Sequence, residues 1–329
     1  FRYSAAILAM LASGNAPPDT EFVRVDGSYE EGLAALLDRL DAQAIGLEAA
    51  HVSWKRLDWW RRRLDASLAG DAGERAARGR CLVATDALVE RERMVKDAHE
   101  IAVLRDAAAR LSTVARDILR DQVVRAGRSE QEIAGEVDWR MKQAGFSRPA
   151  FDTIVASGPN AALPHAQPTT RLVAADELVV LDFGGVLDGY CVDLTRTAAI
   201  GEPGVEARRI HAAVREAQRR AMAAIRAGVA TDAVDAAARG YLAECGLADA
   251  FGHSTGHGLG LEVHEEPRLG MRRTVGPAPL ALEAGVVCTV EPGAYVPGIG
   301  GVRLEDDVLV TADGVEVLTD VPFDARLDG

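Results

Sequence analysis

The segment HSTGHGLGLEVHEEP, residues 253–267, gathers imidazole and carboxylate side chains in a short, glycine-rich span. It holds three of the seven histidines of the chain, His253, His257 and His264. Imidazoles can bind a metal ion, carry protons, or donate hydrogen bonds to developing charge, and glycines let the backbone come close to such a site. The segment therefore predicts either an ordinary polar loop or part of a catalytic site, and the remaining residues must decide.

Two carboxylates interrupt the apolar run ELVVLDFGGVLDGYCVDLTRT, residues 177–197. Asp182 lies inside the first apolar stretch, and Asp193 follows eleven residues later. If a hairpin turns between Leu187 and Asp188, the two aspartates face each other across it. Like charges directly opposite on two strands repel, and a buried carboxylate costs several kcal/mol unless something offsets it.

A second pair of carboxylates repeats this arrangement. Glu291 ends the apolar run GVVCTV, and Glu305 lies inside GVRLEDDVLV. The midpoint between them is Gly298, so a hairpin centred there also brings the two glutamates face to face. Two hairpins that each carry a facing carboxylate pair favour a cation site over a structural role.

Four carboxylates and one imidazole form a hard, oxygen-rich ligand set. Such a set suits Mn, Fe, Co or Zn better than a soft metal, and four negative charges match two divalent cations. Two metals ~3.5–4 Å apart can activate a water and polarise a carbonyl for hydrolysis. One histidine would then be a ligand, while the others carry protons or donate hydrogen bonds.

The elements that position these residues predict an α+β fold with a mostly antiparallel sheet and helices on one face. Residues 29–40 and 52–68 predict helices around a short strand at 44–48. A helical pattern continues from residue 89 to about 124, and Ser129 and Glu132 have the spacing of a capping box before a helix that ends at Gly145. Short strand-like runs then alternate with turns, apart from two helices at 206–227 and 231–245.

Composition limits the classes of function. The net charge of −13 argues against binding nucleic acid through its phosphates. No run reaches the ~18 apolar residues of a membrane span, so neither nucleic acid nor a membrane is expected as a partner. The four cysteines are widely spaced without a CxxC pair, which favours reduced thiols and a cytoplasmic location.

The order Asp182, Asp193, His257, Glu291, Glu305 resembles the dinuclear site of the pita-bread metallopeptidases, the family of methionine aminopeptidase, aminopeptidase P and prolidase. Supporting phrases are NAALPHAQPT, LDFGGVLDGYCVDLTRT, HSTGHGLGLEVHEEP, VEPGAYVPGIGG and VRLEDDVLVT. The wording is most similar to the Xaa-Pro branch. The resemblance implies a curved, mostly antiparallel sheet with helices on its outer face, and cleavage of the bond before proline in proline-containing peptides.

The resemblance also implies roles for single residues. The five residues named in that order would hold two divalent metal ions, manganese first and Co, Fe or Zn as possibilities. Glu291 would in addition exchange a proton with the attacking water. His165, His253 and His264 would line the substrate side, and Arg303 would either support the metal ligands or contact a substrate carboxylate.

The resemblance covers residues 89–329, and residues 1–88 are expected to be a partial α/β N-terminal domain of the creatinase and prolidase type. FRYSAAILAM resembles the middle of that domain, so we expect an N-terminally truncated copy. The family also implies a homodimer.

Alternative functions lie in other classes. A metal-free hydrolase of the creatinase type and a non-catalytic pita-bread binding module both tend to lose ligands, whereas all five are present here. Methionine aminopeptidase shares the chemistry but does not normally carry such an N-terminal domain. The sequence leaves aminopeptidase and dipeptidase unseparated.

Overall fold

The chain divides into two compact units, Phe1–Leu88 and Val89–Gly329. A computed structural model describes residues 21, 23–25, 27–40, 44–67, 81–272, 278–322 and 326–327. The segment FRYSAAILAM lies outside the described residues, and the expected truncation stays a prediction. None of the helices in these ranges is long and apolar enough to cross a membrane.

The described part of the first unit contains two helices and a small sheet. In chain order the described elements are α2 (Tyr29–Leu40), β1 (Ala44–Glu48), α3 (Trp54–Ser67) and β2 (Cys81–Thr85). Strands β1 and β2 pair in parallel, with Ala44 opposite Cys81. Ala34 and Trp60 are buried within this unit.

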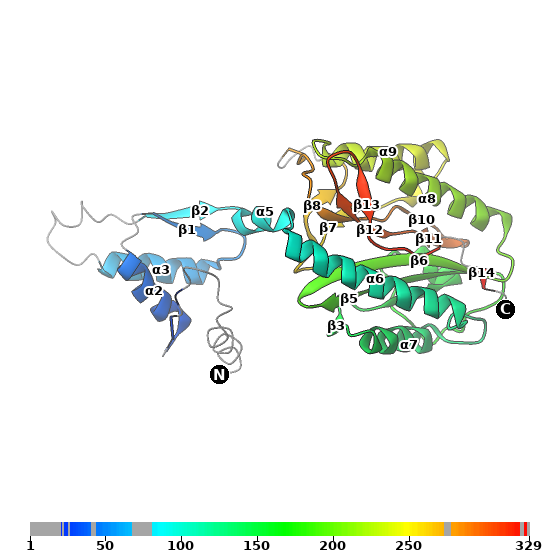
Figure 1. Cartoon of the computed structure of the whole chain (residues 1–329), viewed down its shortest axis with the longest axis horizontal. Coiled ribbons are helices and arrows are strands. Elements are labelled where there is room, and N and C mark those ends of the chain that lie inside the picture. The colour runs from blue at the N-terminus through cyan, green and yellow to red at the C-terminus, as the bar shows by residue number, and fades with distance from the viewer. Residues whose placement is uncertain are drawn as a thin grey trace. The chain divides into compact units, whose positions relative to one another are not determined.

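The second unit begins with helices and then alternates strands with helices (Figure 1). Its first elements are α5 (Leu88–Met94), α6 (Ala98–Arg120), α7 (Glu130–Gln143), β3 (Arg148–Pro149), β4 (Ile154–Ser157) and the 3₁₀ turn η1 (Gly158–Ala162). Next come β5 (Leu178–Leu187), β6 (Tyr190–Ile200), α8 (Val205–Ala224), α9 (Thr231–Glu244) and the 3₁₀ turn η2 (Ala248–Ala250). The rest are β7 (Gly256–Gly258), β8 (Glu265–Leu269), β9 (Val287–Val290), β10 (Gly293–Val296), β11 (Gly300–Arg303), β12 (Asp306–Val310), β13 (Val315–Val317) and β14 (Arg326–Leu327).

The described strands of the second unit form separate sheets. One five-stranded sheet has the strand order β13-β12-β9-β7-β8. Another five-stranded sheet has the order β14-β6-β5-β3, with β4 also paired to β5. Strands β10 and β11 form a two-stranded sheet. Apart from the parallel pair β14–β6, these described pairings are antiparallel.

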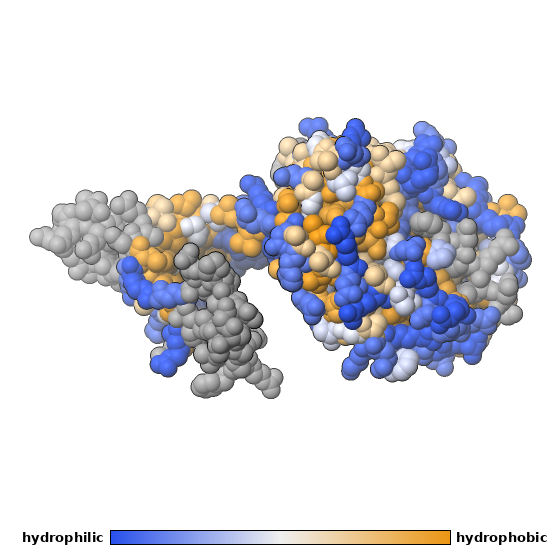
Figure 2. Space-filling view, viewed as in Figure 1, coloured by the Kyte–Doolittle hydropathy of each residue, from blue (hydrophilic) through white to orange (hydrophobic). Residues whose placement is uncertain are grey.

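Two hydrophobic cores lie between strands and helices. Helices α6 and α7 cover β4, β5 and β6 on one side, and α8 and α9 cover strands β7 to β12 on the other (Figure 1). Leu104, Leu111 and Ile133 are fully buried in the first core, and Val214, Val234 and Val308 in the second. On the face of this unit drawn in Figure 2, hydrophilic residues are interspersed with hydrophobic ones.

The helical pattern predicted from residue 89 to 124 is interrupted, so the single long helix was wrong. Asp97 is the N-cap of α6, and its side chain accepts hydrogen bonds from the backbone of His99 and Glu100. Glu100 in turn accepts a hydrogen bond from the Asp97 backbone, at 2.8 Å. This capping box begins α6 as a new helix after α5 has ended at Met94, because it satisfies free N–H groups at the helix start.

The capping box of α7 is confirmed. Ser129 accepts a hydrogen bond from the Glu132 backbone, and Glu132 Oε2 accepts one from the Ser129 backbone at 2.8 Å. Gly145 follows the helix with φ +97°, a conformation that glycine adopts without penalty.

Candidate metal centre

Three of the predicted ligands lie together in the second unit. Asp193 of β6, His257 of β7 and Glu305, between β11 and β12, each offer one ligand atom, and these atoms all lie within 4.8 Å of one another. Glu291 joins them, because its Oε1 is 3.6 Å from Nε2 of His257. Asp182 of β5 is not in the tight group; its Oδ2 forms an ion pair with Arg303.

The first hairpin has a different register from the one predicted. Asp182 pairs with Thr195 and Asp193 pairs with Gly184, so the two aspartates are diagonal neighbours and not directly opposite. The turn consists of Asp188 (φ 49°) and Gly189 (φ 89°), one residue later than expected. Asp-Gly favours this kind of two-residue turn, in which both residues have positive φ. The resulting shift of two residues keeps both side chains on one face, since strand side chains alternate with a period of two.

The second hairpin has the predicted register on both sides of the glutamates. Gly293 pairs with Arg303 in β10–β11, and Val290 pairs with Asp306 in β9–β12. Between these ladders, the Glu291 N–H donates to the Thr255 carbonyl at 2.7 Å, and the Glu305 N–H donates to the Thr195 carbonyl at 3.1 Å. The two glutamates therefore lie where one ladder ends and the next begins, with their backbones bonded to other strands.

The carboxylates of this group carry buried oxygen atoms without a hydrogen-bond donor. In the described part of the chain, Asp182 Oδ1, Asp193 Oδ1 and Glu305 Oε1 are buried and have no partner. Burial, reinforced by the neighbouring carboxylates, raises the pKa of Asp193 and of Glu305 well above the usual range. Burial likewise raises the pKa of Glu291 to about 8. Unpaired buried carboxylates are costly, so this arrangement fits a cation as the missing partner.

His257 has the protonation state and orientation of a metal ligand. Its Nδ1–H donates to the Gly258 carbonyl at 3.0 Å, which leaves the lone pair on Nε2. Burial lowers the pKa of His257 to about 4, so the ring is neutral near pH 7. The Nε2 lone pair then lies 3.6 Å from an oxygen of Glu291 and 4.0 Å from one of Asp193. A metal ion between these atoms would satisfy both the imidazole lone pair and the carboxylate oxygens.

Comparison with known proteins gives the family. Residues 102–312 match the sequence family described as metallopeptidase family M24. The chain belongs to this family. The Xaa-Pro dipeptidase of Pyrococcus furiosus is 38% identical over 234 residues, which are 71% of this chain and 65% of that protein. The chain thus spans slightly less than two thirds of that curated relative.

Solved structures of M24 relatives share the fold. The Xaa-Pro dipeptidase from Bacillus anthracis superposes with a TM-score of 0.86 and 36% identity, covering 97% of this chain and 84% of that one. The X-Pro aminopeptidase from Thermotoga maritima gives a TM-score of 0.80 and 35% identity, with coverage of 98% and 86%. The resemblance to the Xaa-Pro branch and the pita-bread fold are therefore confirmed.

The three other predicted site histidines of this M24 chain occupy different surroundings. His264 packs edge-on against His257, with ring centroids 4.4 Å apart, and is otherwise exposed. His165 is exposed on the segment that follows η1. His253 uses both ring nitrogens, because Nδ1 bonds the Ser254 carbonyl and Nε2 bonds the Tyr295 hydroxyl, each at 2.9 Å. His253 is thus part of a hydrogen-bonded chain, which the sequence did not indicate.

Arg303 joins that chain to the carboxylates. Its guanidinium donates to Asp182 Oδ2, to the Tyr295 hydroxyl at 2.7 Å, to the Thr195 hydroxyl at 3.2 Å and to the Pro164 carbonyl at 3.1 Å. The residue is only 3% exposed. The N–H donors of Arg303 are therefore already hydrogen-bonded to other residues of the protein.

A second layer of buried polar residues was missed by the sequence reasoning. Arg196 Nη2 donates to Asp306 Oδ1 at 2.7 Å, and Gln218 donates to the other oxygen of Asp306 at 2.9 Å. The Thr195 hydroxyl donates to Glu305 Oε2 at 2.6 Å. The signal was the run of polar residues within YCVDLTRTAAI and RLEDDVLV, but a sequence does not say which of them pair.

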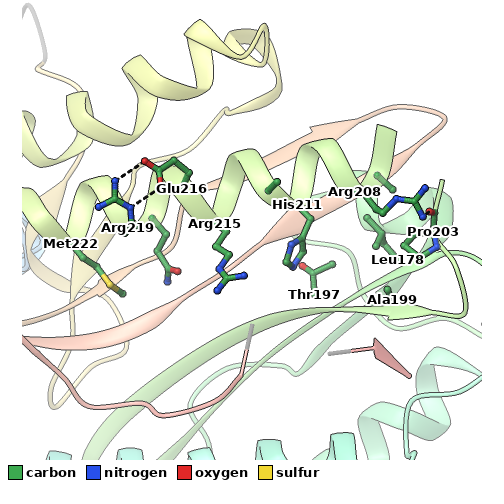
Figure 3. Close-up of a pocket in the computed structure, with 13 residues that line it drawn as sticks. Leu178, Thr197, Ala199, Pro203, Arg208, His211, Arg215, Glu216, Arg219 and Met222 are labelled. Atoms are coloured by element: carbon green, nitrogen blue, oxygen red, sulfur yellow. Dashed lines mark hydrogen bonds and ion pairs between the residues drawn. The ribbon is translucent and has the colours of Figure 1, made fainter. Parts of the chain in front are cut away.

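A separate cavity of about 790 Å³ lies along α8 (Figure 3). Its walls include Leu178, Thr197, Arg208 and Arg219, and the predicted site residues are absent from the described residues that line it. Arg219 pairs with Glu216 at 2.7 Å, as Figure 3 shows, and Arg208 donates to the Pro203 carbonyl at 2.6 Å. The cavity is therefore distinct from the carboxylate group, and size alone does not locate the site.

Proposed function

We propose that this M24 protein hydrolyses the Xaa-Pro bond, at the N-terminus of peptides or in dipeptides, with two divalent metal ions. The observation that carries the proposal is the group of buried, partnerless carboxylate oxygens beside the Nε2 lone pair of His257. Relatives named as Xaa-Pro dipeptidase and X-Pro aminopeptidase support the substrate class.

The proposed ligands are the five residues Asp182, Asp193, His257, Glu291 and Glu305. Two divalent ions bound there would polarise the scissile carbonyl and make water nucleophilic near neutral pH. Oxygen-rich ligands accept several first-row metals, so we propose manganese, with Co, Fe or Zn as substitutes.

The chain's own residues would divide the remaining work. Glu291 is the proposed proton carrier, since its carboxylate lies beside the other proposed ligands, with Oε1 3.6 Å from His257 Nε2. His165 and His264 are exposed and available to contact the peptide carbonyl. The buried contacts of Arg303 support the role of holding Asp182 over the role of binding a substrate carboxylate.

Three further proposals concern the setting of the enzyme. Its substrates are proline-containing peptides, and it works as a homodimer, as the family resemblance implies. The four free cysteines support a reducing, cytoplasmic location.

The test is hydrolysis of Gly-Pro and of a longer Xaa-Pro-Xaa peptide by chelated protein reloaded with Mn²⁺, Co²⁺ or Zn²⁺. We expect metal-dependent cleavage that Glu291→Ala abolishes and that Glu316→Ala retains, because Glu316 is an exposed carboxylate outside the site. Preference for the dipeptide or the longer peptide separates dipeptidase from aminopeptidase.

Other outcomes would favour the other functions. Cleavage of a small amidine or guanidino substrate without metal would indicate a creatinase-like hydrolase. Failure to bind metal at all would overturn the proposed ligand set.

A further inference from the structure

Glu130 is a buried carboxylate outside the proposed metal centre. It is the first residue of α7 and is 0% exposed. Burial alone would raise its pKa, but hydrogen bonds from Thr169 and Ser157 outweigh burial and lower it. The N-terminus of a helix also favours a negative charge. Glu130 is therefore an ionised carboxylate with a specific set of donors.

Those donors come from both ends of one segment, residues 157–169. Ser157 donates to Oε1 through its backbone N–H at 2.7 Å and its hydroxyl at 2.8 Å. Thr169 donates to Oε2 in the same two ways, at 2.9 Å and 2.7 Å. The Asn160 amide bridges both oxygens at 3.0 and 3.1 Å. One carboxylate thus closes a thirteen-residue loop.

The loop closed by Glu130 carries His165 and reaches the metal centre. The Pro164 carbonyl accepts a hydrogen bond from Arg303, which also holds Asp182. The Ala161 carbonyl lies so close to Gly301 of β11 that a side chain at residue 301 would collide with it. A small displacement of the loop would therefore move His165 relative to the carboxylates.

A carboxylate is the group that this arrangement requires. It offers about four lone-pair sites and no donor, whereas an amide replaces one oxygen by an NH₂ group. In Glu130→Gln that NH₂ group would face the donors of Ser157 or of Thr169. One end of the loop would then lose its anchor, while the side-chain volume stays nearly the same.

We propose that Glu130 is a positioning residue for the proposed peptidase reaction. It holds the loop of residues 157–169 so that His165 faces the substrate. This inference rests on the proposed function for its catalytic consequence, but the anchoring itself does not.

The experiment compares Glu130→Gln with Glu132→Gln in the full chain. Glu132 lies in the same helical turn, is exposed, and bonds only Ser129 through its side chain in the described structure, so its variant is a matched loss of charge. Hydrogen–deuterium exchange of residues 158–169 needs no metal and no substrate. We expect faster exchange there in Glu130→Gln only.

Kinetics on Gly-Pro then test the link to His165. We expect kcat/KM to fall about 10- to 100-fold in Glu130→Gln, as for other residues that orient a catalytic group. In a His165→Ala background the same change should have little further effect, because the two residues act through one loop. Glu130→Asp should recover part of the activity.

Two results would overturn the inference: exchange of residues 158–169 equal in the two variants, or effects of Glu130→Gln and His165→Ala that simply multiply. If the wild type cleaves no Xaa-Pro peptide, the proposed function fails while the exchange measurement still decides whether Glu130 anchors the loop. Should Glu130→Gln not fold, Thr169→Val removes one donor from an exposed residue and must show the same exchange change in weaker form.

Discussion

Replacing Glu305 by glutamine should stabilise the metal-free protein, although it removes a proposed metal ligand. Glu305 is 1% exposed, and its Oε1 has no donor among the described residues. Glutamine keeps an oxygen that can accept the hydrogen bond from the Thr195 hydroxyl, which lies 2.6 Å from Oε2 of Glu305 in the wild type. Its NH₂ group would meet Asp193, whose buried Oδ1 also lacks a donor in the described structure.

The size of the effect follows from the distance between the charges. Ligand atoms of Asp193 and Glu305 lie within 4.8 Å, and two full charges at that separation repel by about 3 kcal/mol at an effective dielectric constant of about 20. Taking up a proton at pH 7 to avoid this repulsion costs a similar amount, about 1.4 kcal/mol for each pH unit above the ordinary pKa. We therefore expect Glu305→Gln to add about 2–3 kcal/mol to the free energy of unfolding.

The assay is thermal and urea unfolding of chelated protein at pH 7. A gain of about 2–3 kcal/mol corresponds to a rise in Tm of about 4–12 °C for a unit of this size. With Mn²⁺ at about 100 times its Kd, the wild type should gain about 2.7 kcal/mol that the variant lacks. The difference in Tm between the two proteins should therefore shrink or reverse.

The neighbouring residue supplies the control. Asp306→Asn leaves the buried Arg196 without its counter-charge and should destabilise the chelated protein by about 3 kcal/mol. Equal or lower stability of chelated Glu305→Gln than of chelated wild type would refute the view that these carboxylates repel.

Two other predictions concern pH and packing. Because burial raises the pKa of Glu291 to about 8 in the folded, metal-free protein, the folded state holds a proton that the unfolded chain releases above about pH 4.5; relative to chelated Glu291→Gln, the stability of the chelated wild type should therefore fall from pH 5 to pH 8 and then level off, and a difference in urea unfolding that does not change with pH would contradict this. A methyl group at Gly256 would collide with the Thr289 carbonyl, so Gly256→Ala should lower the free energy of unfolding by about 3 kcal/mol. Gly240→Ala, with nothing nearby on the exposed side of α9, should raise it by about 0.5–1 kcal/mol, and similar effects of the two substitutions would refute the packing argument.

Local sequence signals predicted the elements well where the signal was complete. The capping box at Ser129 and the stop at Gly145 located α7, and the midpoint at Gly298 gave the register of the second hairpin. The two errors came from signals that were present but overlooked. Asp188-Gly189 marks the first turn, and Asp97 with Glu100 marks the start of α6.

Long-range pairings were beyond the sequence. Glu130 looks like an ordinary acidic residue in the first turn of a helix, yet its donors lie 27 to 39 residues later. Arg196 stands out as a charge in an apolar strand, but its partner Asp306 is 110 residues away. Such pairs depend on how strands cross in the folded sheet, which no local pattern contains.

The alternation of side chains along β6 and into β12 explains how a repulsive site can persist in a stable fold. Thr195 bonds Glu305 on one side, whereas the next residues, Arg196 and Asp306, pair with each other on the opposite side. The charges on that opposite side are compensated within the protein, and those around Glu305 are not. The Arg196–Asp306 pair stabilises the same strands from their opposite side, so the fold can hold like charges together until a cation neutralises them. Loss of that pair should therefore disturb the metal centre, although neither residue is a proposed ligand.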